Sequence, residues 1–210
     1  MNWLDISMPL HDQIPVWPGD APFLYRRTWT KAESGTANVG ELHMSTHAGT
    51  HIDAPFHIDE SGQKVHELDL DVYIGKARVI HLLGKKKITA GDLSRFDLGR
   101  ESRLLIRTGS WVDRSQFPGK FCYLDADIAP FLQEREIRLV GLDVPSADSA
   151  DSRELPVHHA FLKAGIHLLE NAVLDKIEEG IYEMIALPLP IRGGDASPVR
   201  AVIRPAGHDS

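Results

Sequence analysis

The chain has a single cysteine, Cys122, among its 210 residues, so it cannot form an internal disulfide. That usage is typical of a reducing compartment, and we predict a cytoplasmic protein. Long apolar runs are also missing, and the first residues lack a basic segment followed by an apolar one. We therefore expect no membrane span and no secretory signal. An excess of positive charge is missing too: 30 acidic residues outnumber 23 lysines and arginines, and the net charge of −7 with neutral histidine argues against nucleic acid or an anionic membrane as the main partner.

The composition fits one globular domain. The apolar fraction is 42% and the charged fraction is 25%, which is ordinary for a globular protein. A chain of 210 residues is long enough for one substantial core and short for two. We predict a single domain over residues 1–210, with a proline-rich N-terminal arm at about residues 1–25.

Short apolar runs rich in branched side chains predict buried strands. They lie at residues 78–83, 103–108, 138–142, 166–169, 182–187 and 199–203. Their continuous bulk indicates that some strands are covered on both faces. Fewer helices are expected: residues 127–135 capped by Asp127, residues 157–164 ending at Gly165, and residues 90–96. The predicted fold class is α/β, with more strand than helix.

Three of the eleven histidines fall in one segment of eleven residues, His47 to His57, together with Asp53. His47 and His51 are four residues apart, a spacing that on one helical turn points two side chains at the same metal ion. Asp53 would point away in a continuing helix, so the chain must turn after His51 for all three to converge. Pro55 favours such a turn because it disfavours helix at the preceding residue.

Two neutral imidazoles and one carboxylate suit zinc, manganese or iron, and a position left open to water makes such a site catalytic. A bound divalent ion lowers the pKa of its water from 15.7 to about 7, which supplies the hydroxide that a hydrolase needs. The alternative is that these are ordinary surface or capping histidines. Three histidines interleaved with Gly-Thr and Asp-x-Pro make that alternative weak.

The segment from His47 to His57 reads His-x-Gly-Thr-His-x-Asp-x-Pro-x-His. It resembles the defining motif of the cyclase-like metal-dependent hydrolases at every fixed position. The resemblance covers nearly the whole chain and is greatest to the arylformamidase branch of that family. Further matching stretches are Trp17-Pro18-Gly19-Asp20, Arg107-Thr108-Gly109, Leu155-Pro156-Val157-His158, Glu170-Asn171 and Asp195-Ala-Ser-Pro198-Val-Arg200.

The resemblance implies a single domain with a central β-barrel-like mixed sheet and peripheral helices. We also expect a homodimer. It also implies two divalent metal ions per chain, zinc in most members, with manganese as the alternative. Its metal ligands are His47, His51 and Asp53 for one ion, and Asp53, His158 and Glu170 for the other, with both Asp53 and Glu170 bridging the two ions. The resemblance makes His57 the general acid/base and places Trp17 against the aromatic ring of the substrate.

Physical chemistry favours some of these assignments and leaves others open. Glu170 ends a buried apolar run, where a carboxylate is costly unless it is paired or bound to metal. His158 and His159 point to different sides, so only one can bind this metal, and His158 fits the family's spacing better. His57 could be a ligand, a partner of a ligand or a proton shuttle. Trp17 could be simple packing, or could reach a neighbouring subunit's site.

The implied activity is hydrolysis of N-formyl-L-kynurenine, a small aromatic formamide, to L-kynurenine and formate in tryptophan degradation. A first alternative is a related hydrolase acting on another small or cyclic amide such as isatin. A second is a non-catalytic metal-binding protein. Cys122 lies in an apolar stretch typical of an inert buried thiol, so a cysteine nucleophile is not expected.

Overall fold

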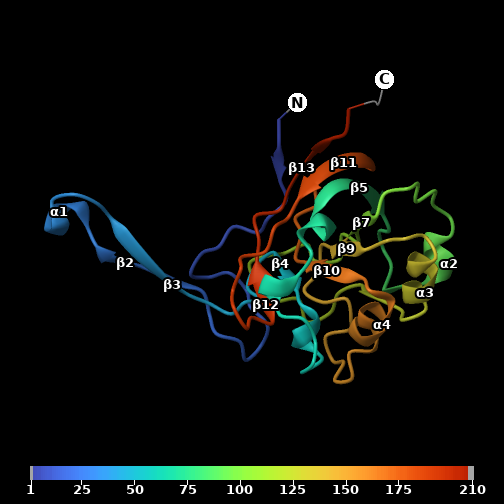
Figure 1. Ribbon diagram of the computed structural model, residues 1–210, viewed down its shortest axis with the longest axis horizontal. Coiled ribbons are helices and arrows are strands. Elements are labelled where there is room, and N and C mark those ends of the chain that lie inside the picture. The colour runs from blue at the N-terminus through green and yellow to red at the C-terminus, as the bar shows by residue number, and fades with distance from the viewer. Residues whose placement is uncertain (1, 208–210) are drawn as a thin grey trace.

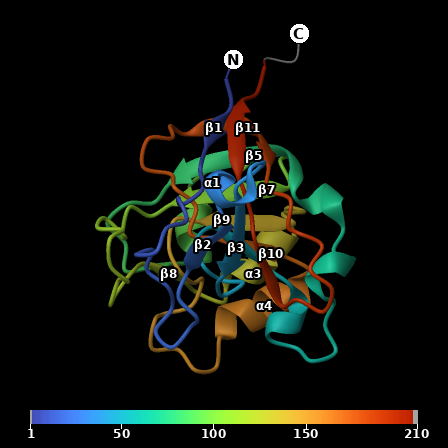
Figure 2. The same ribbon diagram turned by 90° about the vertical axis from the view of Figure 1, so that its left-hand side faces the viewer.

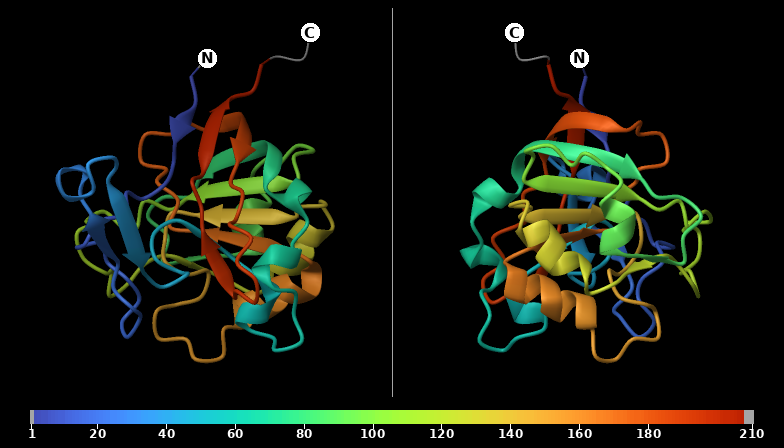
Figure 3. Two further views of the ribbon diagram at one scale, coloured as in Figure 1. Left: turned by 60° about the vertical axis from the view of Figure 1, so that its left-hand side comes forward. Right: turned by 90° about the vertical axis from the view of Figure 1, so that its right-hand side faces the viewer.

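The computed structural model describes residues 2–207, and nine of their strands form one mixed sheet that curls into a half-barrel (Figure 1, Figure 3). The order across the sheet is β1 (Leu4–Asp5), β13 (Val202–Pro205), β11 (Gly180–Ile185), β5 (Ile74–His81), β7 (Arg103–Arg107), β9 (Leu139–Leu142), β10 (His167–Glu170), β4 (His51–Asp53) and β12 (Ala196–Pro198). The four strands β5, β7, β9 and β10 are parallel, and the other neighbouring pairs are antiparallel. The predicted α/β class with a barrel-like mixed sheet is confirmed.

Both faces of the central strands are buried, as the sequence predicted. Along β7, Leu104 and Ile106 pack into one apolar cluster with residues of the helices, while Leu105 packs into a second cluster inside the curl of the sheet. The helices α2 (Ala90–Leu93), α3 (Ile128–Gln133) and α4 (Pro156–Ala164) gather on the first of these faces (Figure 3). Because successive strand residues point to opposite faces, a run of branched residues fills both clusters at once.

The three predicted helices are present, with corrections. The last, α4, ends where expected, at Gly165 in the left-handed conformation with φ +69°. Asp127 precedes α3 but does not cap it; its carboxylate accepts a hydrogen bond from the backbone N of Ala90 instead (3.1 Å). The helix predicted over residues 90–96 is only one turn long, α2.

The strand predicted over residues 199–203 is correct only in part, because β13 begins at Val202. The preceding strand, β12, ends at Pro198 beside β4 at one edge of the sheet, whereas β13 lies between β1 and β11, second from the other edge. Between them the backbone leaves the ladder: Val199 donates to Thr50 O (2.9 Å), and Ala201 O accepts from Ile6 N (3.0 Å). The three residues between β12 and β13 therefore link two strands that lie near opposite edges of the sheet.

A second sheet, not expected from the sequence, projects from the body as a hairpin (Figure 1), which Figure 2 shows from its tip. It consists of β2 (Leu24–Trp29), the one-turn α1 (Lys31–Ser34) and β3 (Val39–His43), and every residue of its two strands is exposed. The chain before it is anchored, since β1 pairs with β13, and Met8, Ile14 and Phe23 pack with Trp111. Smaller elements are the strand pair β6 (Lys87–Ile88) and β8 (Tyr123–Leu124) and the 3-10 turns at Pro55–His57, Val65–Glu67 and Leu70–Val72. Among the residues described, no helix has the length and apolar character needed to cross a membrane.

Candidate metal centre and active site

The histidine–aspartate segment forms a turn followed by a strand, not the helical turn that the spacing suggested. His47 lies in the turn over residues 46–50, and His51 and Asp53 lie in β4. Alternate strand residues share a face, so His51 and Asp53 point the same way, and Ile52 between them enters the core on the other side. The chain therefore turns before His51, where the expectation placed a turn after it.

Strand pairing brings Glu170 to the same place. In the antiparallel pair of β10 and β4, Glu170 lies directly opposite His51, and directly opposed residues share a face of the sheet. His158 reaches the cluster from α4, which covers this face. All five residues that the resemblance named as metal ligands are thus gathered at one point, although they come from three separate segments of the chain.

The two oxygens of each carboxylate in the cluster face different histidines. Asp53 Oδ1 lies 3.1 Å from His47 Nδ1 and 3.4 Å from His51 Nε2, whereas Oδ2 lies 3.6 Å from His158 Nε2. Glu170 repeats the pattern, with Oε2 3.6 Å from His51 Nε2 and Oε1 3.6 Å from His158 Nε2. One side of the cluster therefore holds His47 and His51, and the other holds His158.

The ring nitrogen that faces away from the cluster is fixed in each of these histidines. His51 Nδ1 lies 2.9 Å from Gly49 O, His158 Nδ1 lies 2.6 Å from Asp148 Oδ2, and His47 Nε2 lies 3.0 Å from Asp195 Oδ2. A ring N–H donated to such an acceptor leaves the other nitrogen as a lone-pair donor. Metal-binding histidines are commonly held in this way.

Several buried polar atoms here have no partner with hydrogen-bond geometry among residues 2–207: His51 Nε2 and both carboxylate oxygens of Asp53. The two side chains are only 2% and 8% exposed. Asp53 has imidazoles within ion-pair distance but no partner with hydrogen-bond geometry. A buried carboxylate left without hydrogen bonds is costly, and a divalent cation would satisfy all three atoms. Imidazole and carboxylate donors suit zinc, manganese or iron. The residues present therefore fit a divalent metal ion.

Without a metal, protonated imidazoles neutralise the buried carboxylates of this cluster. Burial alone would raise the pKa of Asp53, but the imidazoles of His158, His47 and His51 hold it well below its ordinary value. Burial opposes charge on His47 too, yet Asp195 and Asp53 raise the pKa of that imidazole to about 10. His158 behaves alike, because Asp148, Asp53 and Glu170 outweigh its burial and raise its pKa. A metal ion entering the cluster must displace these protons.

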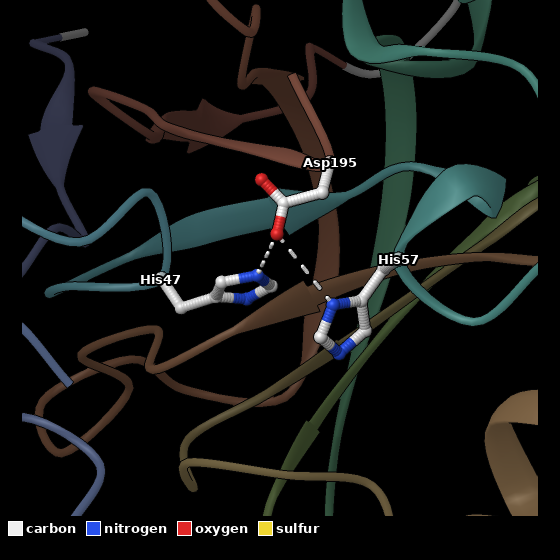
Figure 4. A group of neighbouring side chains, drawn as sticks. All are labelled: His47, His57 and Asp195. Carbon is white, nitrogen blue, oxygen red and sulfur yellow. Dashed lines mark hydrogen bonds and ion pairs between the residues drawn. The ribbon is translucent and has the colours of Figure 1, made fainter. Parts of the chain in front are cut away.

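His57 stands at the edge of the cluster (Figure 4). Its ring centroid lies 4.3 Å from that of His47, its side chain is 30% exposed, and its Nδ1 lies 3.8 Å from Asp195 Oδ2. The same carboxylate oxygen approaches both His47 and His57, while Oδ1 accepts a hydrogen bond from Thr46 Oγ1 (3.0 Å). His57 also has a nitrogen close enough to Asp53 and His158 to be a ligand with them, so geometry leaves both its roles open.

A cavity of about 300 Å³ opens onto the cluster. Aromatic side chains form part of its wall, with Trp17 edge-on to Phe117 at 5.1 Å and Trp111 nearby. His47, His51, His57, His158 and Glu170 also line it. The cavity joins the candidate metal centre to a wall that suits an aromatic substrate, and Trp17 lies on that wall.

Three side chains that matter here received no role from the sequence: Asp148, Asp195 and Asn171. Asp195 and Asn171 lie in stretches that matched the family, which was the available signal; Asp148 had none. Asn171 donates from Nδ2 to Gly49 O (2.9 Å), which fixes the carbonyl that orients His51. In contrast to buried His158, the neighbouring His159 is exposed.

Comparison with known proteins shows the family of this chain. The family described as "Putative cyclase" matches residues 4–149. A protein named kynurenine formamidase from Geobacillus thermodenitrificans is 54% identical over 205 residues, 98% of each chain. One of the same name from Bacillus thuringiensis is 54% identical over 204 residues, 97% of this chain and 98% of the relative.

Solved structures show the same fold. One described as a potential metal-dependent hydrolase with cyclase activity is 27% identical, with a TM-score of 0.83 over 96% of both chains. Isatin hydrolase A from Labrenzia aggregata is 23% identical, with a TM-score of 0.83 over 98% of this chain and 94% of the other. A curled mixed sheet with this donor set is the framework of a metal-dependent hydrolase. The chain belongs to the cyclase family.

Proposed function

We propose that this chain is an arylformamidase that hydrolyses N-formyl-L-kynurenine to L-kynurenine and formate, a step of tryptophan degradation. One observation carries the proposal: a cluster of histidines and carboxylates with unpaired buried atoms lies on a cavity walled by aromatic side chains. The kynurenine formamidases that share 54% of their residues with this chain, over nearly its full length, support the same substrate.

The metal content that we propose is two divalent ions, zinc before manganese. The first would be held by His47, His51 and Asp53, and the second by His158 together with Asp53 and Glu170 as shared ligands. The proposal is supported by the orientation of Asp53 and Glu170, because each carboxylate has one oxygen near His51 and the other near His158. When bound, such ions polarise a carbonyl and lower the pKa of water toward 7.

The chain's own residues would complete the reaction. An aniline nitrogen leaves a tetrahedral intermediate readily only when it is protonated, and a histidine can pass that proton near neutral pH. His57 suits this role because its partly exposed ring faces the cavity and Asp195 holds its Nδ1 side. Trp17 would stack on the substrate ring and orient the formamide toward the cluster.

The assembly that we propose is a homodimer of single-domain chains, each with an N-terminal arm at about residues 1–25, in the cytoplasm. Support for the dimer comes from the hairpin, where large apolar side chains are about half exposed or more. They are Leu24, Tyr25, Trp29, Val39 and Leu42. Apolar surface of this extent on a projecting element is typical of an interaction site. The single cysteine favours a reducing compartment.

Metal analysis and a formamidase assay on one preparation test the function. We expect about two divalent ions per chain, as in two-metal hydrolases, and loss of activity on chelation. His57→Ala should retain metal and lose turnover; loss of metal would make His57 a ligand instead. His158→Ala should lose metal, whereas the adjacent control His159→Ala should not.

The choice of substrates separates the alternatives. Metal-loaded protein that opens isatin and leaves N-formyl-L-kynurenine intact would favour a cyclic-amide hydrolase, the activity named for several structural neighbours. Metal-loaded protein that cleaves neither compound would favour a metal-binding role without catalysis.

A further inference from the structure

The cavity carries two charged side chains that the metal chemistry does not use. Asp20 lies within the N-terminal arm, on the loop between β1 and β2, and Arg153 lies on the loop between β9 and α4. Among the described residues that line the cavity, Arg153 is the sole lysine or arginine. Outside the candidate metal cluster, Asp20 and Arg153 are therefore the two charged groups on a wall that is otherwise made of aromatic, aliphatic and uncharged polar side chains.

Asp20 is fixed relative to Trp17 by a tight turn. Asp20 N donates to Trp17 O (2.9 Å), and the two residues between them are Pro18 and Gly19, the latter with φ +103°. Proline second and a positive-φ glycine third are the requirements of a type II turn. Asp20 Oδ2 also accepts a hydrogen bond from Ser45 Oγ (2.7 Å). A group that stacks on Trp17 thus has a carboxylate held beside it.

Arg153 is available to a ligand. Its side chain is exposed and takes part in none of the hydrogen bonds or ion pairs found among residues 2–207. The loop that carries it is shaped by its own backbone, since Ser152 N donates to Ser149 O (2.9 Å) and Leu155 N lies 3.2 Å from Ser152 Oγ. Both Ser152 and Leu155 line the cavity as well. A guanidinium binds carboxylates through paired hydrogen bonds, and in a chain of net charge −7 a carboxylate substrate needs such a partner.

We infer that Arg153 and Asp20 form a subsite for the α-amino-acid end of the substrate, with Arg153 binding the α-carboxylate and Asp20 the α-ammonium group. The inference rests on the proposed function, because N-formyl-L-kynurenine is an aryl formamide that carries an amino-acid group at its other end. The formyl group meets the metal cluster, the ring lies along Trp17, and the zwitterion meets the charged pair. Selectivity for an amino acid over a neutral aryl amide then comes from these two residues.

The test compares three formamides: N-formyl-L-kynurenine, N-formylkynuramine, which lacks the carboxylate, and the deaminated analogue, which lacks the ammonium group. Arg153→Gln should raise KM for N-formyl-L-kynurenine about tenfold, equivalent to about 1.4 kcal/mol of binding free energy. Its KM for N-formylkynuramine and its kcat should stay at the wild-type values. Asp20→Asn, which keeps an acceptor for Ser45, should raise KM for N-formyl-L-kynurenine but not for the deaminated analogue.

Arg95→Gln is the matched control, because Arg95 is exposed and does not line the cavity; it should change none of the KM values. Equal changes in KM for the full substrate and the truncated one, or no change for either, would overturn the subsite and leave the proposed function standing. Wild-type protein, loaded with zinc, that cleaves none of the three formamides would overturn the function and the subsite together.

Discussion

Asp148 should control how tightly His158 binds a metal ion, although Asp148 itself is not a proposed ligand. Its carboxylate is 2% exposed and accepts from His158 Nδ1 (2.6 Å), Val157 N (3.0 Å) and His158 N (3.1 Å). It therefore both caps the first turn of α4 and orients the imidazole. Asp148→Asn keeps an acceptor for the backbone but removes the charge and can present an N–H to Nδ1. Loss of such an orienting partner lowers metal affinity about 10- to 100-fold, or about 1.4–2.7 kcal/mol.

The assay is a zinc titration against a competing chelator, with the melting temperature measured separately in excess chelator. Asp143→Asn is the matched control, since Asp143 is 1% exposed and also accepts three hydrogen bonds, from Thr108 N, Thr108 Oγ1 and Gly109 N. Both variants should lose about 1–3 kcal/mol of unfolding free energy. Only Asp148→Asn should lose zinc affinity, and an equal loss in Asp143→Asn would refute the orienting role.

Further predictions concern the protonation of His47, the buried Cys122 and the exposed hairpin. Because the pKa of His47 is raised from 6.5 to about 10, its protonated ring stabilises the metal-free fold fully below about pH 6.5. That stability is lost as pH rises toward 10, so the melting temperature of the metal-free protein should fall over this range. Zinc binding at pH 7.5 should also release protons, and calorimetry in buffers of different ionisation enthalpy that detects no release would contradict this prediction. Burial raises the pKa of Cys122 to about 12, so Cys122→Ala should keep full activity and the native thiol should resist a disulfide reagent; rapid labelling would disprove it. Replacing Trp29 and Leu42, each 63% exposed, with serine should yield monomers in gel filtration, and an unchanged dimer would remove the hairpin from the interface.

The sequence predicted those features of the fold and the site for which a local pattern has one physical explanation. The apolar runs gave the central strands, because a strand buried on both faces needs branched side chains at every position. The glycine after residues 157–164 gave the end of α4, because a left-handed terminal residue favours glycine. Glu170 stood out since a carboxylate ending a buried run needs a partner, and it lies beside His51 and His158.

Sequence-based prediction failed where two interacting residues are distant in the chain, or where one residue spacing is compatible with two local structures. His47 and His51 fit a helical turn on paper, yet the turn before β4 brings them together equally well, and spacing alone does not distinguish the two. Asp148 precedes His158 by ten residues, and Asp195 follows His47 by 148. Nothing local marks either carboxylate as the partner of a histidine. The hairpin was missed because its exposed strands carry none of the continuous apolar bulk that marked the buried ones.

The register of β4 decides whether the metal centre exists at all. Ile52 is fully buried in the inner cluster, opposite Leu169 of β10, and its two neighbours His51 and Asp53 therefore face the other side. A slip of one residue would reverse all three. It would expel an isoleucine whose burial contributes about 1.5–3 kcal/mol and drive a carboxylate into an apolar core. A residue that touches no metal thus fixes which way two proposed ligands point, and the hydrophobic core specifies the metal site as strongly as the donors do.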